Sequence, residues 1–152
     1  TSFAKKILML IGEYIHVIDD KKRLSLPAKF RKELGKKVVI TNGLDKCLFV
    51  YTKERWGKMA EQLASLSMGQ ADTRSFNRFL LGGAVETEVD ALGRILIPEF
   101  QKEFAGLNAK VVIVGVHNRL EIWNDKTWSE YKARIGGQAD VLAEKLGELG
   151  AI

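Results

Sequence analysis

The sequence predicts an α+β protein built from two tandem β-β-α-β-β repeats. Three observations lead to this fold class. The segment that begins at Gly12 matches the segment that begins at Gly83, at an offset of 71 residues. Each copy alternates apolar and polar residues in short runs that suit strands. Each copy also holds a short helical pattern that begins at a proline and ends at a glycine. Because two copies are too few for a solenoid, the halves are expected to cover each other.

Each repeat is expected to begin with a β-hairpin around an acidic turn. Alternating apolar residues lead to Asp19 in the first copy and to Asp90 in the second, and the short strands RLSLP and RILIP follow the two turns. Their inward positions are Leu24, Leu26, Ile95 and Ile97. The stretch VDALGRI is typical of a type I turn closed by a left-handed glycine, here Gly93.

A short helix and a second hairpin complete each unit. Residues four apart predict the buried helix faces, Phe30 with Leu34 in the first copy and Phe100 with Phe104 in the second. The second hairpins are VVI with CLFVY and VVIVGV with RLEIW. A longer helix then follows a capping residue in each copy, and its apolar positions are Trp56, Met59 and Leu63 after Thr52, and Trp128, Tyr131 and Ile135 after Asn124.

The repeats divide the chain into five segments. Residues 9–63 and 83–135 are the two repeats, and residues 64–82 form a linking helix. Residues 1–8 are expected to be an N-terminal extension or an expression remnant. Residues 136–152, which begin at Gly136 and Gly137, are expected to form a C-terminal helix. Its apolar stripe of Leu142, Leu146 and Leu149 is expected to pack either on its own chain or on a neighbouring subunit.

The basic residues are concentrated in the first half of the chain. The net charge is +5, but residues 1–76 hold 15 basic and 8 acidic residues, whereas residues 77–152 hold 9 and 11. Between Lys21 and Lys37, eight basic residues face a single acid, Glu33. Such a stripe attracts nucleic acid because it releases counterions from phosphates. A solvated helix face is the other reading of the same charges.

Composition and motifs exclude several classes of protein. One cysteine and two histidines provide neither a disulfide framework nor a zinc site. No apolar run reaches the roughly 18 residues that a membrane helix needs, so a soluble, cytoplasmic protein is expected. We find no nucleophile elbow or phosphate loop. The sequence therefore predicts no enzyme, no catalytic residue, no metal, no cofactor and no small-molecule substrate.

The pattern D-x-x-x-R occurs once in each repeat, as Asp19 with Arg23 and Asp90 with Arg94. An acid beside a guanidinium fixes its orientation and leaves other donors free for a phosphate or a guanine edge. A turn-stabilising ion pair is the structural alternative. Two copies in matched contexts, each followed by (L/I)-x-(L/I)-P and a short helix, favour the functional interpretation.

The combined pattern closely resembles the bacterial MraZ family. GEYIHVIDDKKRLSLPAKFR, GLDKCLFVY and GAVETEVDALGRILIP are similar to its signature stretches, and the resemblance covers about residues 9–149. It implies an AbrB-like double swapped-hairpin β-barrel with peripheral helices. It also implies a sequence-specific DNA-binding transcriptional regulator of the division and cell-wall gene cluster, which acts at the nucleoid. A ring of identical subunits would read repeated elements of double-stranded promoter DNA through its basic hairpin turns.

The resemblance assigns roles to residues of the two turns. It implies DNA binding by Lys21, Arg23 and Arg94, supported by the turn acids Asp19 and Asp90, with Lys22 and Lys29 as candidate phosphate contacts. The family usually has glycine where Lys22 stands, and a left-handed lysine costs about 1 kcal/mol, so the sequence leaves the geometry of the first turn open. Leu92 replaces the loop lysine of the second turn, which predicts a weaker electrostatic contribution there.

Two other functions remain open at this point. A ring-forming structural or assembly protein without specific DNA readout would use the same arginines for subunit contacts. An RNA-binding regulator is the other alternative, although rigid hairpin arginines suit a duplex groove better than splayed bases. The operator sequence, the sign of regulation and the number of subunits do not follow from the sequence.

Overall fold

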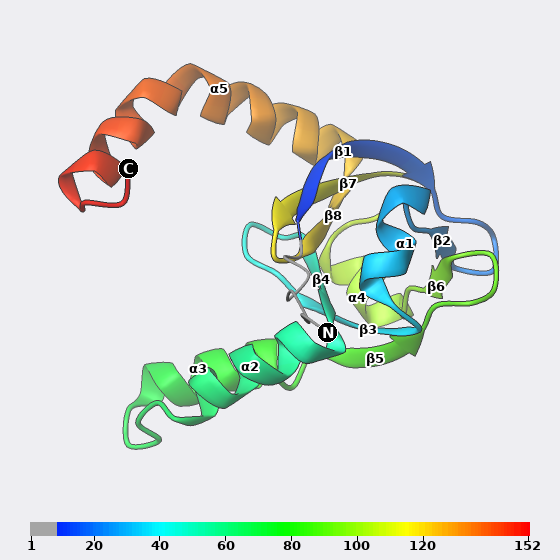
Figure 1. Ribbon diagram of the computed structural model, residues 1–152, viewed down its shortest axis with the longest axis horizontal. Helices are drawn as coiled ribbons and strands as arrows, with labels where there is room; N and C mark the ends of the chain where they lie inside the picture. The colour runs from blue at the N-terminus through cyan, green and yellow to red at the C-terminus, as the bar shows by residue number, and fades with distance from the viewer. Residues whose placement is uncertain (1–8) are drawn as a thin grey trace, which may run out of the picture.

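The computed structural model describes residues 9–152 as an α+β protein with mostly antiparallel strands (Figure 1). The segment predicted as an extension or remnant, residues 1–8, lies outside the described residues. The elements of the first repeat and the link are β1 (Leu10–Val17), β2 (Arg23–Ser25), α1 (Ala28–Leu34), β3 (Lys37–Asn42), β4 (Leu48–Thr52), α2 (Lys53–Ala64) and α3 (Ala71–Leu80). The second repeat holds β5 (Val85–Glu88), β6 (Arg94–Leu96), α4 (Glu99–Phe104), β7 (Lys110–His117), β8 (Leu120–Asn124) and α5 (Asp125–Glu148).

The two repeats exchange their first strands. The six-stranded sheet has the order β1-β7-β8-β4-β3-β5. The β3–β4 and β7–β8 hairpins form within their repeats as predicted. β1, however, pairs with β7 of the second repeat, and β5 pairs with β3 of the first. The prediction that the halves cover each other is therefore confirmed.

The prediction that β1–β2 and β5–β6 form hairpins is wrong. β1 and β2 share only the isolated bridge Ile18↔Leu24, while β2 pairs with β6 in a separate two-stranded ribbon. β1 aligns eight residues with β7, whereas β2 offers only three residues for pairing. Pairing of β1 with β7 is more stable than pairing of β1 with β2, because each added residue pair contributes hydrogen bonds and side-chain packing.

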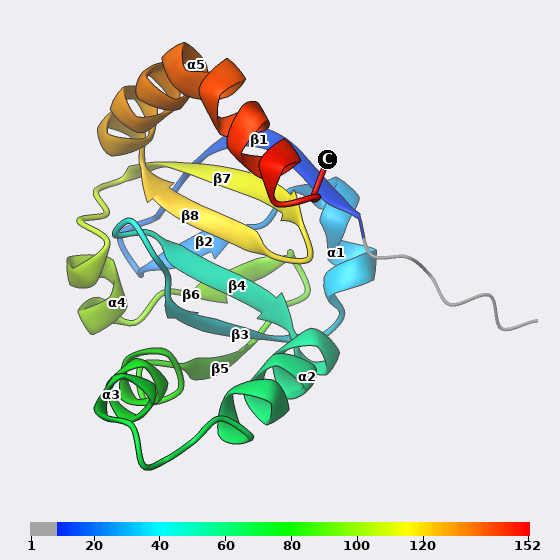
Figure 2. The ribbon, with the colours of Figure 1, turned by 90° about the vertical axis from the view of Figure 1, so that its left-hand side faces the viewer.

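The β-barrel that the family resemblance implied is not closed in the described residues. β1 and β5 form the two edges of the six-stranded sheet and do not pair with each other, and the β2–β6 ribbon remains a separate sheet. Figure 2 shows the six-stranded sheet between α2 and α5 on one side and the ribbon on the other. The six-stranded sheet and the ribbon are therefore two separate layers and not one closed barrel.

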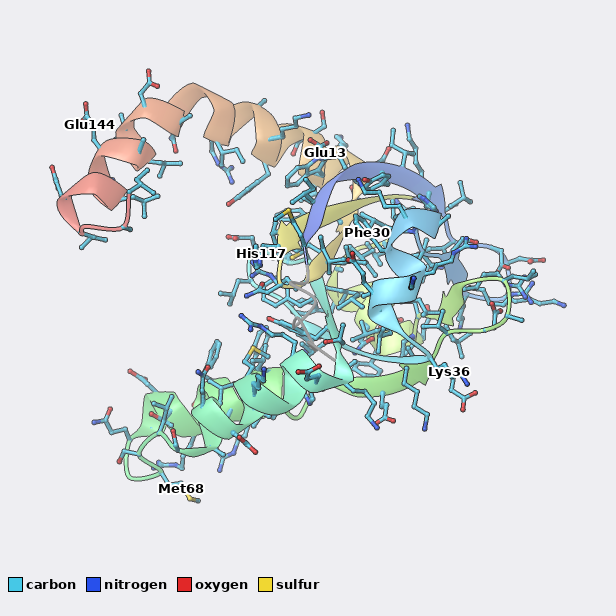
Figure 3. All side chains as sticks on the ribbon, in the orientation of Figure 1. Glu13, Phe30, Lys36, Met68, His117 and Glu144 are labelled. Atoms are coloured by element: carbon cyan, nitrogen blue, oxygen red, sulfur yellow. The ribbon has the colours of Figure 1, made fainter. Side chains whose placement is uncertain are left out.

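Two apolar clusters cover the two faces of the large sheet. The inner cluster joins the sheet to the ribbon and to α1, and it buries Leu24, Ile95 and Phe30, the last labelled in Figure 3. The outer cluster packs Trp56 of α2 and Trp128 of α5 against the opposite face. The inward positions predicted for the two short strands are confirmed, since all four are at most 1% exposed.

Helix α4 departs from its predicted face. Phe30 and Leu34 of α1 are buried as expected, but Phe100 of α4 is 51% exposed and Gln101 is fully buried in its place. Gln101 Nε2 donates to the carbonyls of Ile40 and Gly83, both at 2.9 Å. These bonds satisfy the buried Nε2 and join Gly83, the first residue of the second repeat, to β3, whereas the buried Oε1 has no hydrogen-bond partner among the described residues.

The helices after β4 and β8 begin at the predicted caps. Thr52 Oγ1 accepts from the Arg55 amide at 3.1 Å, and Asn124 Oδ1 accepts from the Thr127 amide at 3.0 Å. α5 runs through Gly136 and Gly137, where a separate C-terminal helix was predicted to begin. No helix among residues 9–152 is long and apolar enough to cross a membrane.

The C-terminal stripe is not buried by the described residues, 9–152. Figure 1 shows α5 reaching away from the sheet, and the exposed fractions of Leu142, Leu146 and Leu149 are 42%, 44% and 81%. Of the two expectations for this stripe, packing on its own chain is not met within residues 9–152.

Candidate nucleic-acid interface

The two D-x-x-x-R turns lie at opposite ends of the short β2–β6 ribbon, on the side of the molecule away from α2, α3 and α5 (Figure 1). The antiparallel β2–β6 ribbon brings them there, because its register pairs Leu24 with Ile95, the equivalent residues of the two repeats. The Leu26 amide donates to Gly93 O and the Ile97 amide donates to Lys22 O, both at 2.9 Å. A local twofold relationship thus places the turns as equivalents.

Each turn aspartate holds its arginine through the same set of bonds. Arg23 Nε donates to Asp19 Oδ2 at 2.8 Å, and Arg94 Nε donates to Asp90 Oδ2 at 2.8 Å. The other carboxylate oxygen accepts the arginine amide, at 2.9 Å in the first turn and 2.8 Å in the second. A second loop amide also donates to this oxygen in each turn, that of Lys21 or Leu92, at 2.9 Å. Among the described residues, each guanidinium bonds through Nε alone, so the terminal donors are available to a ligand.

These bonds favour the charged form of both carboxyls. The backbone N–H of Arg23 and then its guanidinium hold the pKa of Asp19 below its usual range, although partial desolvation opposes them. Arg94 lowers the pKa of Asp90 in the same way. Both aspartates are therefore ionised at neutral pH, and each turn presents an oriented ion pair.

The first turn, whose geometry the sequence left open, has the same backbone geometry as the second at this position. Lys22 has φ +63° and Gly93 has φ +78°, so both turns use the left-handed region at the same position. The Lys22 amide donates to Asp19 O at 3.0 Å, and Lys22 Nζ lies 2.8 Å from Glu99 of the other repeat. The bonds made by Asp19 and the pairing with β6 offset the cost of a left-handed lysine.

The remaining predicted residues are lysines of the first turn and of α1. Lys21 is exposed in the loop. Lys29 is exposed on α1, with Nζ 5.7 Å from the Phe30 ring centroid. Because Lys22 already pairs with Glu99, it is the least free of the three lysines to contact a phosphate.

The second turn gains basic residues from the first repeat. An ideal Cβ on Gly93 would overlap the Arg31 guanidinium, so the α1 arginine rests directly against this turn. Arg31 Nε also donates to Leu26 O at 3.2 Å. With Lys36 and Lys37 it lines an open depression of about 490 Å³ beside Asp90; Figure 3 labels Lys36. Sequence reasoning included these residues in the basic stripe but did not assign them to the second turn, because no local pattern reveals a contact between repeats.

Among residues 9–152, no group of three or more histidine, cysteine, aspartate or glutamate side chains could hold a metal ion. The two turns present guanidinium cations that are oriented by carboxylates. Arg23 and Arg94 follow their turns on one outward face of the ribbon, since Leu24 and Ile95 between them point into the core.

Comparisons with known proteins agree with this arrangement of repeats. The family model described as "MraZ protein, putative antitoxin-like" matches residues 9–79 and again residues 80–145. A Moorella thermoacetica protein named "Transcriptional regulator MraZ" is 51% identical over 91% of this chain and 96% of its own length. Relatives of the same name from Caldicellulosiruptor saccharolyticus and a Thermoanaerobacter species are each 47% identical, over 93% of this chain and 99% of their own length. The chain belongs to the MraZ family, and each repeat carries one copy of the family's domain.

Proposed function

We propose that this protein is a sequence-specific DNA-binding transcriptional regulator rather than an enzyme. The observation that carries the proposal is the pair of carboxylate-oriented arginines on one outward face of a two-stranded ribbon. The name "Transcriptional regulator MraZ", borne by its relatives, supports the regulatory role. Preorganised guanidiniums suit a duplex because little side-chain entropy is lost when they bind.

The spacing of the two arginines fits base reading in the major groove. Arg23 lies opposite Leu96, and Arg94 lies two residues before Leu96, so the two arginines are diagonal neighbours. Diagonal neighbours in an antiparallel pair are about 7–8 Å apart. Base pairs rise by about 3.4 Å, so this distance spans about two base-pair steps. A two-stranded ribbon enters a groove about 12 Å wide, where arginine binds guanine O6 and N7.

Lysines beside the turns provide the sequence-independent part of binding. Lys21 is free at the first turn, and Lys29 and Arg31 stand on α1 beside the ribbon. Lysine and arginine contacts to phosphates release counterions and make affinity depend on salt. We expect Lys21 to contribute more than Leu92, its counterpart in the second turn.

The finer features implied by the family resemblance belong to the same proposal. The exchange of β1 and β5 between repeats supports an AbrB-like swapped-hairpin arrangement. The exposed stripe on α5 supports assembly into a ring, in which several ribbons would meet repeated promoter elements on one duplex. The target is the division and cell-wall gene cluster, and the protein would act in the cytoplasm at the nucleoid.

Selection from a pool of random DNA duplexes tests the proposal, followed by affinity measurements on the enriched duplex. Arg23→Ala and Arg94→Ala should each weaken binding to that duplex far more than to an unrelated one. Lys21→Ala should weaken both about equally and reduce the salt slope by about one. Single-stranded RNA should compete poorly. No enriched duplex, or equal affinity of the wild type and the double arginine variant, would instead favour the assembly protein without DNA readout.

A further inference from the structure

The outward surfaces of the two repeats have diverged at three equivalent positions. Residues 71 apart in the chain occupy matching places, and the first repeat has polar or basic side chains where the second has apolar ones. The pairs are Lys21 with Leu92 in the turns, Ser25 with Leu96 in the ribbon, and Lys29 with Phe100 on the short helices. The apolar members are 63%, 52% and 51% exposed, so none of the three serves the core. The buried partners Leu24 and Ile95 have remained alike.

The ribbon register places one of these pairs beside the two arginines. Leu96 lies directly opposite Arg23, and Ser25 lies directly opposite Arg94. Hydrogen bonds join β2 and β6 at the flanking pairs Leu26 with Gly93 and Ile97 with Lys22. Because bonded and non-bonded pairs alternate, the pairs that contain the arginines are non-bonded, with side chains about 4.5–5.5 Å apart at Cβ. One outward face therefore carries an Arg–Leu pair and an Arg–Ser pair.

We infer that Leu96 is a specificity-determining residue that contacts the 5-methyl group of a thymine next to the base read by Arg23. Ser25 is its polar counterpart beside Arg94 and offers a hydrogen bond to a base edge. This inference rests on the proposed function. It adds that Leu96 of the second repeat makes thymine the preferred base at one position of the site. The ribbon then recognises two different base-pair steps, one through Arg23 with Leu96 and one through Arg94 with Ser25, although its backbone is close to twofold symmetric.

Double-stranded DNA is the occupant that the surrounding charges favour. Leu96 stands between two guanidiniums that point to the same side, and Lys21 and Lys29 flank the ribbon. An apolar protein surface would have to bury the terminal donors of both guanidiniums and the lysine ammonium groups without acceptors, which is costly. The major groove offers acceptors for the guanidiniums and, at thymine, one apolar group on the base edge. A leucine beside an arginine matches a thymine beside a guanine.

The test replaces thymine by uracil in the DNA, which removes the 5-methyl group of the base and changes nothing else. Full-length protein is used to select a duplex from a random pool, and each thymine of that duplex is then replaced in turn by deoxyuridine. Burial of one methyl group predicts about a four-fold loss of wild-type affinity at one position. Leu96→Ser places the residue of the first repeat at this site. That variant should already bind the thymine duplex about four-fold more weakly and should not respond to deoxyuridine.

Leu66→Ser is the matched control, because it also replaces a leucine that is about half exposed but lies between α2 and α3, far from the ribbon (Figure 1). This variant should keep the full deoxyuridine effect. The inference is overturned if the selected site lacks thymine, if no replacement weakens the wild type, or if Leu96→Ser responds as the wild type does. Each of these results leaves specific binding intact, whereas failure to enrich any duplex would overturn the proposed function and this inference together.

Discussion

Gly93→Ala is expected to destabilise the protein through a contact between repeats. Its φ of +78° costs an L-residue about 1–2 kcal/mol, partly offset by about 0.4–1 kcal/mol from the stiffer unfolded chain. The new Cβ would also displace Arg31, whose Nε bonds Leu26 O at 3.2 Å. Loss of that bond adds about 0.5–1.5 kcal/mol. The free energy of unfolding should therefore fall by about 2 kcal/mol, which lowers Tm by about 4–8 °C in a chain of this size.

Gly106→Ala isolates the contribution of backbone strain. Gly106 has φ +60°, and nothing lies within 4 Å of an ideal Cβ there. Its replacement should cost only about 1 kcal/mol. Equilibrium urea unfolding can be followed by the fluorescence of the three tryptophans, all of which belong to the outer cluster. In an Arg31→Ala background, Gly93→Ala should cost no more than Gly106→Ala. The reasoning fails if the two alanine variants are equally destabilised in the wild-type background, or if Arg31→Ala leaves the cost of Gly93→Ala unchanged.

Three other predictions concern the turns and the exchange of strands. Arg23→Ala and Arg94→Ala should each cost about 1–3 kcal/mol of specific DNA binding and relax selectivity at one base, with an unchanged unfolding curve as control. The lowered pKa values of Asp19 and Asp90 stabilise the folded state above the usual aspartate range, and this stability is lost as pH falls through the lower folded values. Replacing both by asparagine should flatten the dependence of unfolding free energy on pH between about 5 and 2; an unchanged slope would contradict this. Residues 9–82 alone should be unfolded or self-associated, because β1 and β3 lack β7 and β5; a folded monomer by sedimentation and circular dichroism would refute the interdependence.

Local patterns in the sequence were sufficient to predict the turns. An aspartate four residues before an arginine fixed both ion pairs, and capping residues marked the starts of α2 and α5. The β3–β4 and β7–β8 hairpins also followed, because their strands are adjacent in the chain and pair directly. These features depend on residues within a few positions of one another.

Features that depend on contacts between distant segments were missed. Alternation shows which face of β1 is buried but not whether its partner is β2 or β7. Gln101 occupies a core position because two carbonyls from distant segments accept its amide, and nothing nearby in the chain indicates them. Helix propensity marked Gly136 as a break, yet the cost of about 1 kcal/mol for a glycine is small enough for α5 to continue.

The pairing of β4 with β8 at the centre of the sheet explains why the two arginines of the ribbon keep different neighbours, Leu96 beside Arg23 and Ser25 beside Arg94. β4 and β8 meet with Phe49 opposite Glu121, which are equivalent residues of the two repeats. Arg119 lies 4.3 Å from the centroid of the Phe49 ring and bonds Glu121 at 2.9 Å, and the Trp123 indole donates to the same carboxylate at 3.1 Å.

Two second repeats in this register would set Glu121 against Glu121, two nearly buried carboxylates whose repulsion is costly. Two first repeats would place Phe49 against Phe49, with Cys47 where Arg119 supplies the cation. Unlike repeats therefore pair best, and their linkage within one chain supplies that pairing in every molecule. A ribbon assembled from one repeat of each kind always carries Leu96 beside one arginine and Ser25 beside the other, so a difference between the two steps of a DNA site can be read by a single subunit.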